Sequence, residues 1–448
     1  MNQDLTRGSI TASLLKFAWP FMIGNLLQQL YNIVDTLIVG KYLGSNALAA
    51  VGSAYTLMVF LTSILLGLSM GSGVAFSIYC GKREPEKLRQ SVFLAFCLIG
   101  AVTVALNVLV FAAMDPILRL LQVPADCYGL MRDYLWVVFW GIAATFLYNF
   151  FACLLRALGN SVTPLLFLGL SALLNVALDL AFVLVLHWGV AGAAAATVVA
   201  QYVSGLGLGL YTLLRCPAIR VNRRHMRWNR ALMEELLQLS GLTCIQQSVM
   251  NFGILMVQGQ VNAFGPAVMA AFAAAVKIDS FAYMPVQDFG NAFSTFIAQN
   301  YGAGRQERIR RGITSAAGTT LIFSLAVSVL VVLFARPLLQ IFIQAGETEI
   351  LDIGVRYLRI EGSFYCLIGF LFLFYGYFRA VKMPAMSLVL TVISLGTRVV
   401  LAYGLSAIPA VGVTGIWVSV PIGWFLADAV GLWYGWKREK QQKEPVAK

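Results

Sequence analysis

The sequence predicts an all-α polytopic membrane protein, with twelve transmembrane helices in two pseudo-symmetric lobes of six. Three observations predict this fold. The 448-residue chain is 59% hydrophobic and only 12% charged, whereas soluble proteins carry about 25% charged residues. Apolar runs of about 20 residues, long enough to cross a bilayer as a helix, recur along the whole chain. The second half of the chain also repeats the pattern of the first.

The apolar runs between polar breaks give the expected helices in order. Their ranges are 14–43, 47–80, 91–113, 133–154, 165–187, 191–214, 235–263, 268–300, 313–334, 356–378, 385–406 and 412–436. The N-terminal run continues far beyond a signal-peptide core and has no small-residue cleavage site, so we expect the first helix to be retained.

The distribution of basic residues orients these helices. With the N-terminus inside, 24 of the 32 Lys and Arg residues fall on the cytoplasmic side and six in outer loops. The positive-inside rule predicts such a bias, so the net charge of +12 reflects topology and not a nucleic-acid partner. Both termini are therefore expected in the cytoplasm.

An internal repeat relates the two halves of the chain. Segment 71–91 matches 292–312 at a constant offset, which pairs Gly81 with Gly302. The motifs LLRA (154–157) and YFRA (377–380) pair at an offset that is two residues longer. Parallel repeats of this kind are typical of alternating-access transporters, which bind substrate between the two lobes.

The repeat sets the expected domain boundaries. They are an N-lobe at 1–214 with helices 1–6, a basic cytoplasmic linker at 215–232, a C-lobe at 233–436 with helices 7–12, and a basic cytoplasmic tail at 437–448.

A few polar residues lie at membrane depth, where an ionisable group is costly and is therefore a functional candidate. Counting 1.5 Å per residue places Asp35 on helix 1, Asp179 on helix 5 and Thr197 on helix 6 roughly 9–12 Å below the outer surface. Asn175 lies one turn deeper, on the same helical face as Asp179.

This cluster suits a proton or a sodium ion, because close carboxylates raise one another's proton affinity and sodium favours several oxygen ligands. The alternative is that the polar groups only tie helices 1, 5 and 6 together. The repeat argues against that alternative, since Met256 and Val420 occupy the C-lobe positions equivalent to Asp35 and Thr197.

The run PFMIGNLLQQLYNIVDTLIVGKYLGSNALAAVG (20–52) and the later QNYGAG (299–304) resemble the multidrug and toxic compound extrusion (MATE) transporters, closer to the DinF-like branch. The resemblance covers essentially the full chain and implies a cation-coupled exporter of amphipathic, often cationic compounds. It implies a cation-coupling site at Asp35, Asn175, Asp179 and Thr197 with the backbone carbonyl of Ala193, and a helix-1 hinge at Pro20. The sodium-coupled branch carries acids on helices 7 and 10, whereas here helix 7 has only amides and helix 10 only Glu361, near its outer end.

Three further charges, Lys277, Asp279 and Arg398, are expected near the membrane midplane. Either Lys277 or Arg398 neutralises Asp279, or the three groups form a wall of the substrate cavity. Arg156 and Arg379 occupy matched inner loops, where they are either positive-inside anchors or a cytoplasmic gate.

The substrate cavity is expected to use amides, aromatics and flexible methionines, although such residues on buried helices also serve packing. The candidates are Gln28, Tyr31, Asn32, Gln246, Met250, Met256, Lys277, Asp279, Tyr283, Met284 and Arg398.

The predicted function is a proton- or sodium-coupled antiporter that exports drugs or toxic organic compounds from the cytoplasmic membrane of a prokaryote. We expect small organic substrates and membrane lipids as partners, a monomer, and no cofactor beyond the coupling ion, H⁺ or Na⁺. A lipid-linked saccharide flippase of the same superfamily is the alternative, and a non-transporting receptor or scaffold is a more distant one. An enzyme is not expected, since the chain has two histidines and neither a nucleophile elbow nor a phosphate loop.

Overall fold

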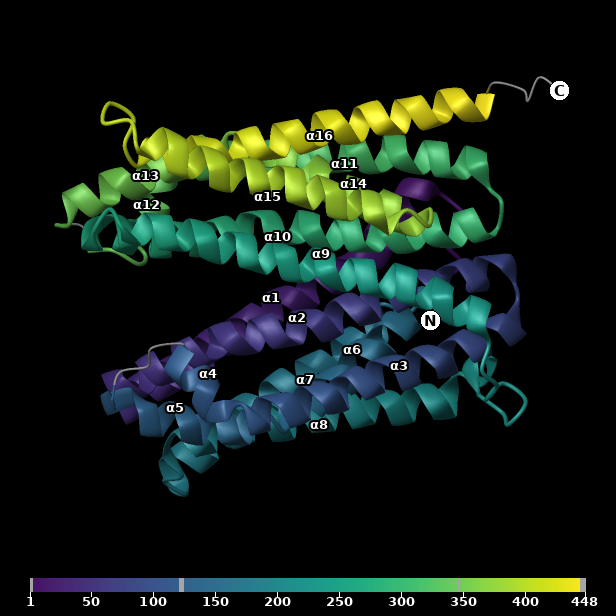
Figure 1. The fold of residues 1–448 in the computed structure, drawn as a ribbon, viewed down its shortest axis with the longest axis horizontal. Coiled ribbons are helices and arrows are strands. Elements are labelled where there is room, and N and C mark those ends of the chain that lie inside the picture. The colour runs from purple at the N-terminus through teal and green to yellow at the C-terminus, as the bar shows by residue number, and fades with distance from the viewer. Residues whose placement is uncertain (1–2, 121–124, 345, 444–448) are drawn as a thin grey trace. The chain divides into compact units, whose positions relative to one another are not determined.

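The computed structural model describes residues 3–120, 125–344 and 346–443, and within these ranges the regular structure is entirely helical (Figure 1). The α-helices are α1 (Ile10–Leu43), α2 (Ser45–Lys82), α3 (Pro85–Ala112), α4 (Met114–Leu120), α5 (Ala125–Val138), α6 (Gly141–Ala157), α7 (Val162–Asp179), α8 (Gly189–Arg215), α9 (Arg230–Asn262), α10 (Pro266–Gly302), α11 (Gln306–Leu333), α12 (Ala335–Leu339), α13 (Thr348–Gly362), α14 (Tyr365–Ala380), α15 (Pro384–Ser406) and α16 (Thr414–Lys443). Two short helical turns, η1 (Leu180–Val185) and η2 (Pro217–Ile219), flank α8.

These helices account for the twelve expected spans. Among the described residues, nine are long and apolar enough to cross a membrane, and two bent pairs, α5 with α6 and α13 with α14, bring the number to eleven. The remaining expected span, 235–263, corresponds to α9, a helix of 33 residues whose amide side chains make it less apolar.

Two expected spans are broken and not continuous, which corrects the predicted helices 133–154 and 356–378. The bends are 45° between α5 and α6 and 51° between α13 and α14. At the second break the hydroxyl of Ser363 donates to the carbonyl of Arg359 at 2.6 Å, and such back-bonding bends helices. The offset that pairs Arg156 with Arg379 also pairs the two breaks to within one residue, so both halves share this feature.

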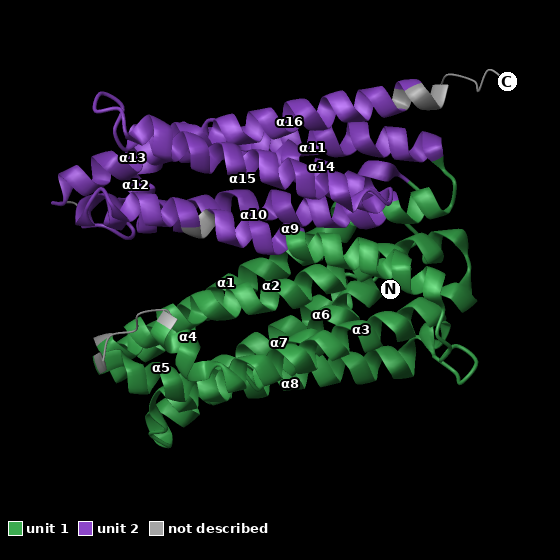
Figure 2. Cartoon of the chain, in the orientation of Figure 1, with its two compact units in different colours: residues 1–8, 15–245, 298–305 green, residues 9–14, 246–297, 306–448 purple. Residues whose placement is uncertain are grey.

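The chain divides into two compact units (Figure 2). Unit 1 contains residues 1–8, 15–245 and 298–305, and unit 2 contains 9–14, 246–297 and 306–448. Helix α10 contributes its last turn to unit 1 and the rest to unit 2. The lobe and linker boundaries expected from the repeat stay a prediction, and residues 444–448 of the expected tail lie outside the described residues.

A close backbone contact within unit 1 joins the ends of α2 and α10. A Cβ atom on Gly81 would overlap the carbonyl oxygen of Gln299, and a Cβ on Gly302 would overlap that of Ile78. The repeat offset that pairs Gly81 with Gly302 also pairs Ile78 with Gln299. The two contacts are therefore equivalent, and each requires a glycine because only a residue without Cβ lets the backbones approach this closely.

Candidate functional site

Asp35 and Asp179 come from two helices of unit 1. Asp35 lies in the second half of α1, and Asp179 is the last residue of α7. Directly after Asp179 the chain forms one π-helical turn, η1 (Leu180–Val185), before α8 begins. Insertions of this type are rare and occur frequently at functional sites, because the widened turn changes the direction in which nearby side chains point. The apolar run 165–187 gives no sign of this turn.

The carboxyl groups of Asp35 and Asp179 lie within hydrogen-bonding reach of each other. Asp179 is completely buried and Asp35 is half-buried. Oδ1 of Asp35 and both carboxylate oxygens of Asp179 lack a hydrogen-bond donor among the described residues. Ionised carboxylates can only accept hydrogen bonds. The two groups can therefore form a hydrogen bond with each other only when one of them is protonated.

Neutral oxygen atoms continue the site from α7 to α8. Asn175 donates from Nδ2 to Oγ1 of Thr197 at 3.3 Å, and Thr197 donates in turn to the carbonyl oxygen of Ala193 at 3.2 Å. These bonds leave Oδ1 of Asn175 buried without a donor. A buried acceptor without a partner is costly. Oδ1 of Asn175 and the unpartnered carboxylate oxygens of Asp35 and Asp179 could therefore bind a proton or a cation.

The arrangement contains the five residues expected at the cation-coupling site and consists of oxygen donors. Within the described residues no group of three or more His, Cys, Asp or Glu could hold a transition metal or similar ion. Two carboxylates with an amide, a hydroxyl and a backbone carbonyl suit a proton or a hard monovalent cation, which prefers oxygen.

Three tyrosines lie near this acid pair, and two of them, Tyr55 and Tyr134, are not among the residues expected from the sequence. The charges of Asp35 and Asp179 act on Tyr134 of α5, which is buried, and the charge of Asp35 acts on the expected cavity residue Tyr31. Tyr55 of α2 lies beside both tyrosines. Tyr55 lies within an apolar run and Tyr134 begins one directly after Asp133, and a tyrosine at either kind of position is also compatible with packing.

The other expected residues of α1 follow the same helix. Tyr31 lies within hydrogen-bonding reach of the exposed Gln28, and Asn32 is half-buried. Pro20, the expected hinge, is buried inside α1, which continues on both sides of it. Because proline has no N–H, it leaves one carbonyl of the preceding turn without its helical hydrogen bond, which allows a bend there.

Of the two cations expected to neutralise Asp279, the structure brings only Arg398 close to it. Asp279 is buried in α10, and the charge of the half-buried Arg398 of α15 acts on it. Lys277 is exposed, and its Nζ lies 5.6 Å from the ring centre of Phe342. Residues two apart on a helix point in different directions, which explains why Lys277 and Asp279 separate.

A second acid, Glu361 near the end of α13, lies with Asp279 in unit 2, and its expected place near the outer end of the membrane helix stays a prediction. Glu361 is 1% exposed, and Tyr357 donates to its Oε2 at 3.0 Å and to Oδ2 of Asp279 at 3.5 Å. The charge of Asp279 also acts on Tyr365, whose hydroxyl is buried without a hydrogen-bond partner among the described residues. The i, i+4 spacing of Tyr357 and Glu361 was the signal that could have revealed this cluster.

The remaining cavity candidates are divided between buried and exposed positions of unit 2. Gln246 is buried and its Oε1 lacks a donor, whereas Met256 is 38% exposed. Met250, Tyr283 and Met284 are half-buried, and the ring of Tyr283 lies 6.3 Å from that of Phe372. The charges of Asp279 and Arg398 also act on Tyr283, so we group Tyr283 with the acid cluster.

The two expected gate arginines are each held within their own unit. The guanidinium of Arg156 lies 4.2 Å from the ring centre of Phe21, a cation–π contact between α6 and α1. Arg379 is buried and donates from an Nη to Oδ1 of Asn291 at 3.2 Å. The gate role of both arginines stays a prediction.

The fold and the site together define a helical multi-pass membrane transporter built from an internal repeat. The MatE family model matches residues 20–181 and 240–404, so the chain belongs to the MatE family of multidrug efflux transporters. The chain is 30% identical over 444 residues to the probable multidrug resistance protein YpnP of Bacillus subtilis, with 98% of each chain covered. It is 24% identical over 426 residues to the FAD transporter of Shewanella oneidensis, with 91% of this chain and 90% of that one covered.

Solved structures confirm the predicted fold class. A MOP superfamily transporter from Pyrococcus furiosus superposes with a TM-score of 0.93 at 24% identity, covering 99% of this chain and 100% of that one. A MATE protein in the straight conformation superposes with a TM-score of 0.91 at 23% identity, covering 99% of this chain and 100% of that one. A MATE protein in the bent conformation superposes with a TM-score of 0.92 at 24% identity, covering 99% of each chain.

Proposed function

We propose that this chain is an antiporter that exports amphipathic, often cationic, organic compounds in exchange for a proton or a sodium ion. The observation that carries the proposal is the contact between the carboxyl groups of Asp35 and Asp179, with three oxygens that lack a donor. Two adjacent buried negative charges are unstable together, so the pair needs a proton or a cation.

In this account the acid pair changes its charge during transport. With one proton shared between them, the carboxyl groups satisfy one another and carry one negative charge instead of two. Release of the proton restores the second charge, and Asn175 and Thr197 hold the helices that carry the pair. The coupling ion then favours the neutralised pair, and a cationic substrate favours the pair with both negative charges. Binding of one therefore weakens binding of the other, as antiport requires.

The direct carboxyl–carboxyl contact makes the proton the first candidate and sodium the second. A shared proton needs only the two carboxyl groups in contact. Sodium would recruit further oxygen ligands, and Oδ1 of Asn175 and the carbonyl oxygen of Ala193 are neutral oxygens of this site.

The structure weakens the support for a lipid-linked saccharide flippase. That alternative depended on Lys277 and Arg398 forming a cationic cavity for pyrophosphate. Lys277 contacts Phe342 instead, and the charge of Arg398 acts on both Asp279 and Glu361. With two acids beside one cation, this part of unit 2 offers no excess positive charge to a pyrophosphate.

The proposed membrane arrangement follows the basic residues. We place the transporter in the cytoplasmic membrane of a prokaryote with both termini inside, and the positive-inside rule supports that orientation. The names of the relatives support organic substrates, since YpnP is named a probable multidrug resistance protein and the Shewanella protein an FAD transporter.

Efflux from proteoliposomes under separately imposed pH and sodium gradients tests the proposal. An organic cation should be transported under one of the two gradients, and Asp35→Asn and Asp179→Asn should each abolish the gradient dependence. Asp126→Asn, an exposed acid of α5, is the matched control. Transport by both site variants at the wild-type rate would overturn the coupling assignment, and transport of a lipid-linked saccharide in place of the cation would favour the flippase.

A further inference from the structure

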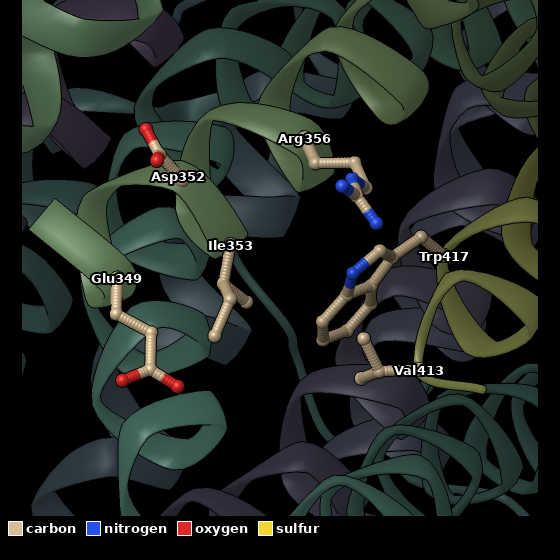
Figure 3. A pocket seen from close by; sticks show the side chains of 6 residues that line it. All are labelled: Glu349, Asp352, Ile353, Arg356, Val413 and Trp417. Carbon is tan, nitrogen blue, oxygen red and sulfur yellow. The ribbon is translucent and has the colours of Figure 1, made fainter.

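A pocket in unit 2 lies between α13 and the N-terminal end of α16 (Figure 3). Its volume is about 220 Å³, which exceeds the cavity of about 150 Å³ that accommodates benzene in a protein core. The residues that line it are Glu349, Asp352, Ile353, Arg356, Val413 and Trp417. None of these belongs to the proposed coupling site or to the expected substrate cavity.

The floor of the pocket carries a buried donor without an acceptor. Trp417 is 1% exposed, and its indole Nε1 has no hydrogen-bond partner among the described residues. The ring is stacked on Phe272 at 5.4 Å and meets Tyr357 edge-on at 4.9 Å, so it cannot turn to find a partner. Figure 3 shows the indole nitrogen on the side of the ring that faces Ile353, below the guanidinium of Arg356. An indole N–H fixed in this way requires an acceptor from whatever fills the pocket.

Arg356 provides a second donor above the indole (Figure 3). One Nη of Arg356 donates to Oγ1 of Thr414 at 3.4 Å, which holds the guanidinium at the pocket and leaves its other N–H groups for a ligand. A carboxylate placed between Arg356 and Trp417 would accept from both groups.

The opposite end of the pocket is acidic. Glu349 forms no ion pair within the described residues, whereas Asp352 is paired with Arg336 at 3.3 Å and points away from the space (Figure 3). One face of α13 presents Glu349, Ile353 and Arg356, at positions i, i+4 and i+7. Along this face an acid is followed by an apolar side chain and then by a cation. The rise between Glu349 and Arg356 is about 10 Å.

We propose that this pocket binds a small zwitterion whose ammonium and carboxylate groups are separated by a short apolar chain. The carboxylate contacts Arg356 and Trp417, the methylene chain lies over Ile353 and Val413, and the ammonium group contacts Glu349. An α-amino acid, with its two charges on one carbon, cannot reach both ends. The site is independent of the proposed antiport, and its test requires no transport.

Equilibrium dialysis of radiolabelled 6-aminohexanoate against the purified full chain in a non-ionic maltoside detergent tests the proposal. The wild type should bind it saturably and more tightly than hexanoate, hexylamine or leucine. Arg356→Gln should weaken binding at least about tenfold, since a charge-assisted bond is lost, and should remove the preference over hexylamine. Glu349→Gln should remove the preference over hexanoate. Arg359→Gln, an exposed arginine of the same helix outside the pocket, should leave binding unchanged.

Two results would overturn the proposal. Absence of saturable binding of 6-aminohexanoate to the wild type would mean that only water fills the pocket. Equal binding by Arg356→Gln and Arg359→Gln, with unchanged melting temperatures, would mean that any bound compound lies elsewhere. The indole ¹⁵N–H resonance of Trp417, assigned with Trp417→Phe, gives a second readout, because a carboxylate at the site should shift it and hexylamine should not.

Discussion

The carboxyl groups of Asp35 on α1 and Asp179 at the end of α7 lie within hydrogen-bonding reach of each other. No cationic side chain acts on either of them among the described residues, so we propose that a proton or an ion from outside the chain opposes their charges. The contact explains why an apolar helix carries an acid at membrane depth, where an ionised group is costly.

Removal of either acid should uncouple transport. In Asp35→Asn and in Asp179→Asn the remaining carboxyl group has an amide neighbour and no second charge, so it no longer needs a coupling ion. We expect gradient-driven efflux to fall to the level of empty liposomes in both variants, measured with a fluorescent organic cation. Wild-type efflux by either variant, with the Asp126→Asn control also at the wild-type rate, would show that the acid pair is not involved.

Thr197 should adjust the affinity for the coupling ion without abolishing transport. Thr197→Val removes both the acceptor for Asn175 and the donor to Ala193, two neutral hydrogen bonds of about 1 kcal/mol each. We expect the ion concentration at half-maximal efflux to rise several-fold, whereas Thr197→Ser should restore it. An unchanged half-maximal concentration in Thr197→Val would contradict a role for this hydroxyl.

The stability of unit 2, which contains the acid cluster of Asp279 and Glu361, should depend on Arg398 and not on Lys277. Arg398→Gln leaves Asp279 and Glu361 without their neighbouring cation, and an uncompensated buried charge costs about 3–5 kcal/mol. Lys277→Gln removes only an exposed contact with Phe342. Melting temperatures in detergent should fall clearly for Arg398→Gln and stay near wild type for Lys277→Gln, and the reverse order would contradict the observed pairing.

The equivalent glycine contacts of α2 and α10 should tolerate no side chain. Gly81→Ala and Gly302→Ala each place a Cβ against a backbone carbonyl, which cannot move without displacing its helix. We expect both variants to lose stability or transport, measured by melting temperature and efflux. Gly52→Ala, in the same helix α2 with nothing within 4 Å of the added Cβ, should be neutral or stabilising by up to about 1 kcal/mol. Three variants of equal stability would contradict the contact.

The fold could be predicted because its signals are local and repeated. Apolar runs of membrane length give the spans, and the repeat of Gly81 in Gly302 gives the pseudo-symmetry. The breaks between α5 and α6 and between α13 and α14 could not be predicted in the same way. Hydropathy averages over a window that is longer than a bend, so a broken span and a straight one give the same profile.

The acid pair of unit 1 was accessible from depth counting, because Asp35, Asp179 and Thr197 lie at similar distances from their helix ends. The cluster of Asp279 and Glu361 was not, because the two acids lie on different helices, α10 and α13, and only the fold brings both to the hydroxyl of Tyr357. The C-lobe positions equivalent to Asp35 and Thr197 are apolar, yet unit 2 buries acids at other positions. A repeat therefore predicts the shared frame and not the polar residues that each half adds to it.

Infrared difference spectroscopy of the lipid-reconstituted protein tests the central claim most directly, because it detects the carbonyl stretch of a protonated carboxyl group without a substrate. On a step from acidic to alkaline buffer, the wild type should lose a carboxyl signal that is missing from Asp35→Asn, from Asp179→Asn and from the double variant. Sodium at constant pH should remove the same signal if both ions use the site. A signal of wild-type size in the double variant would contradict the account.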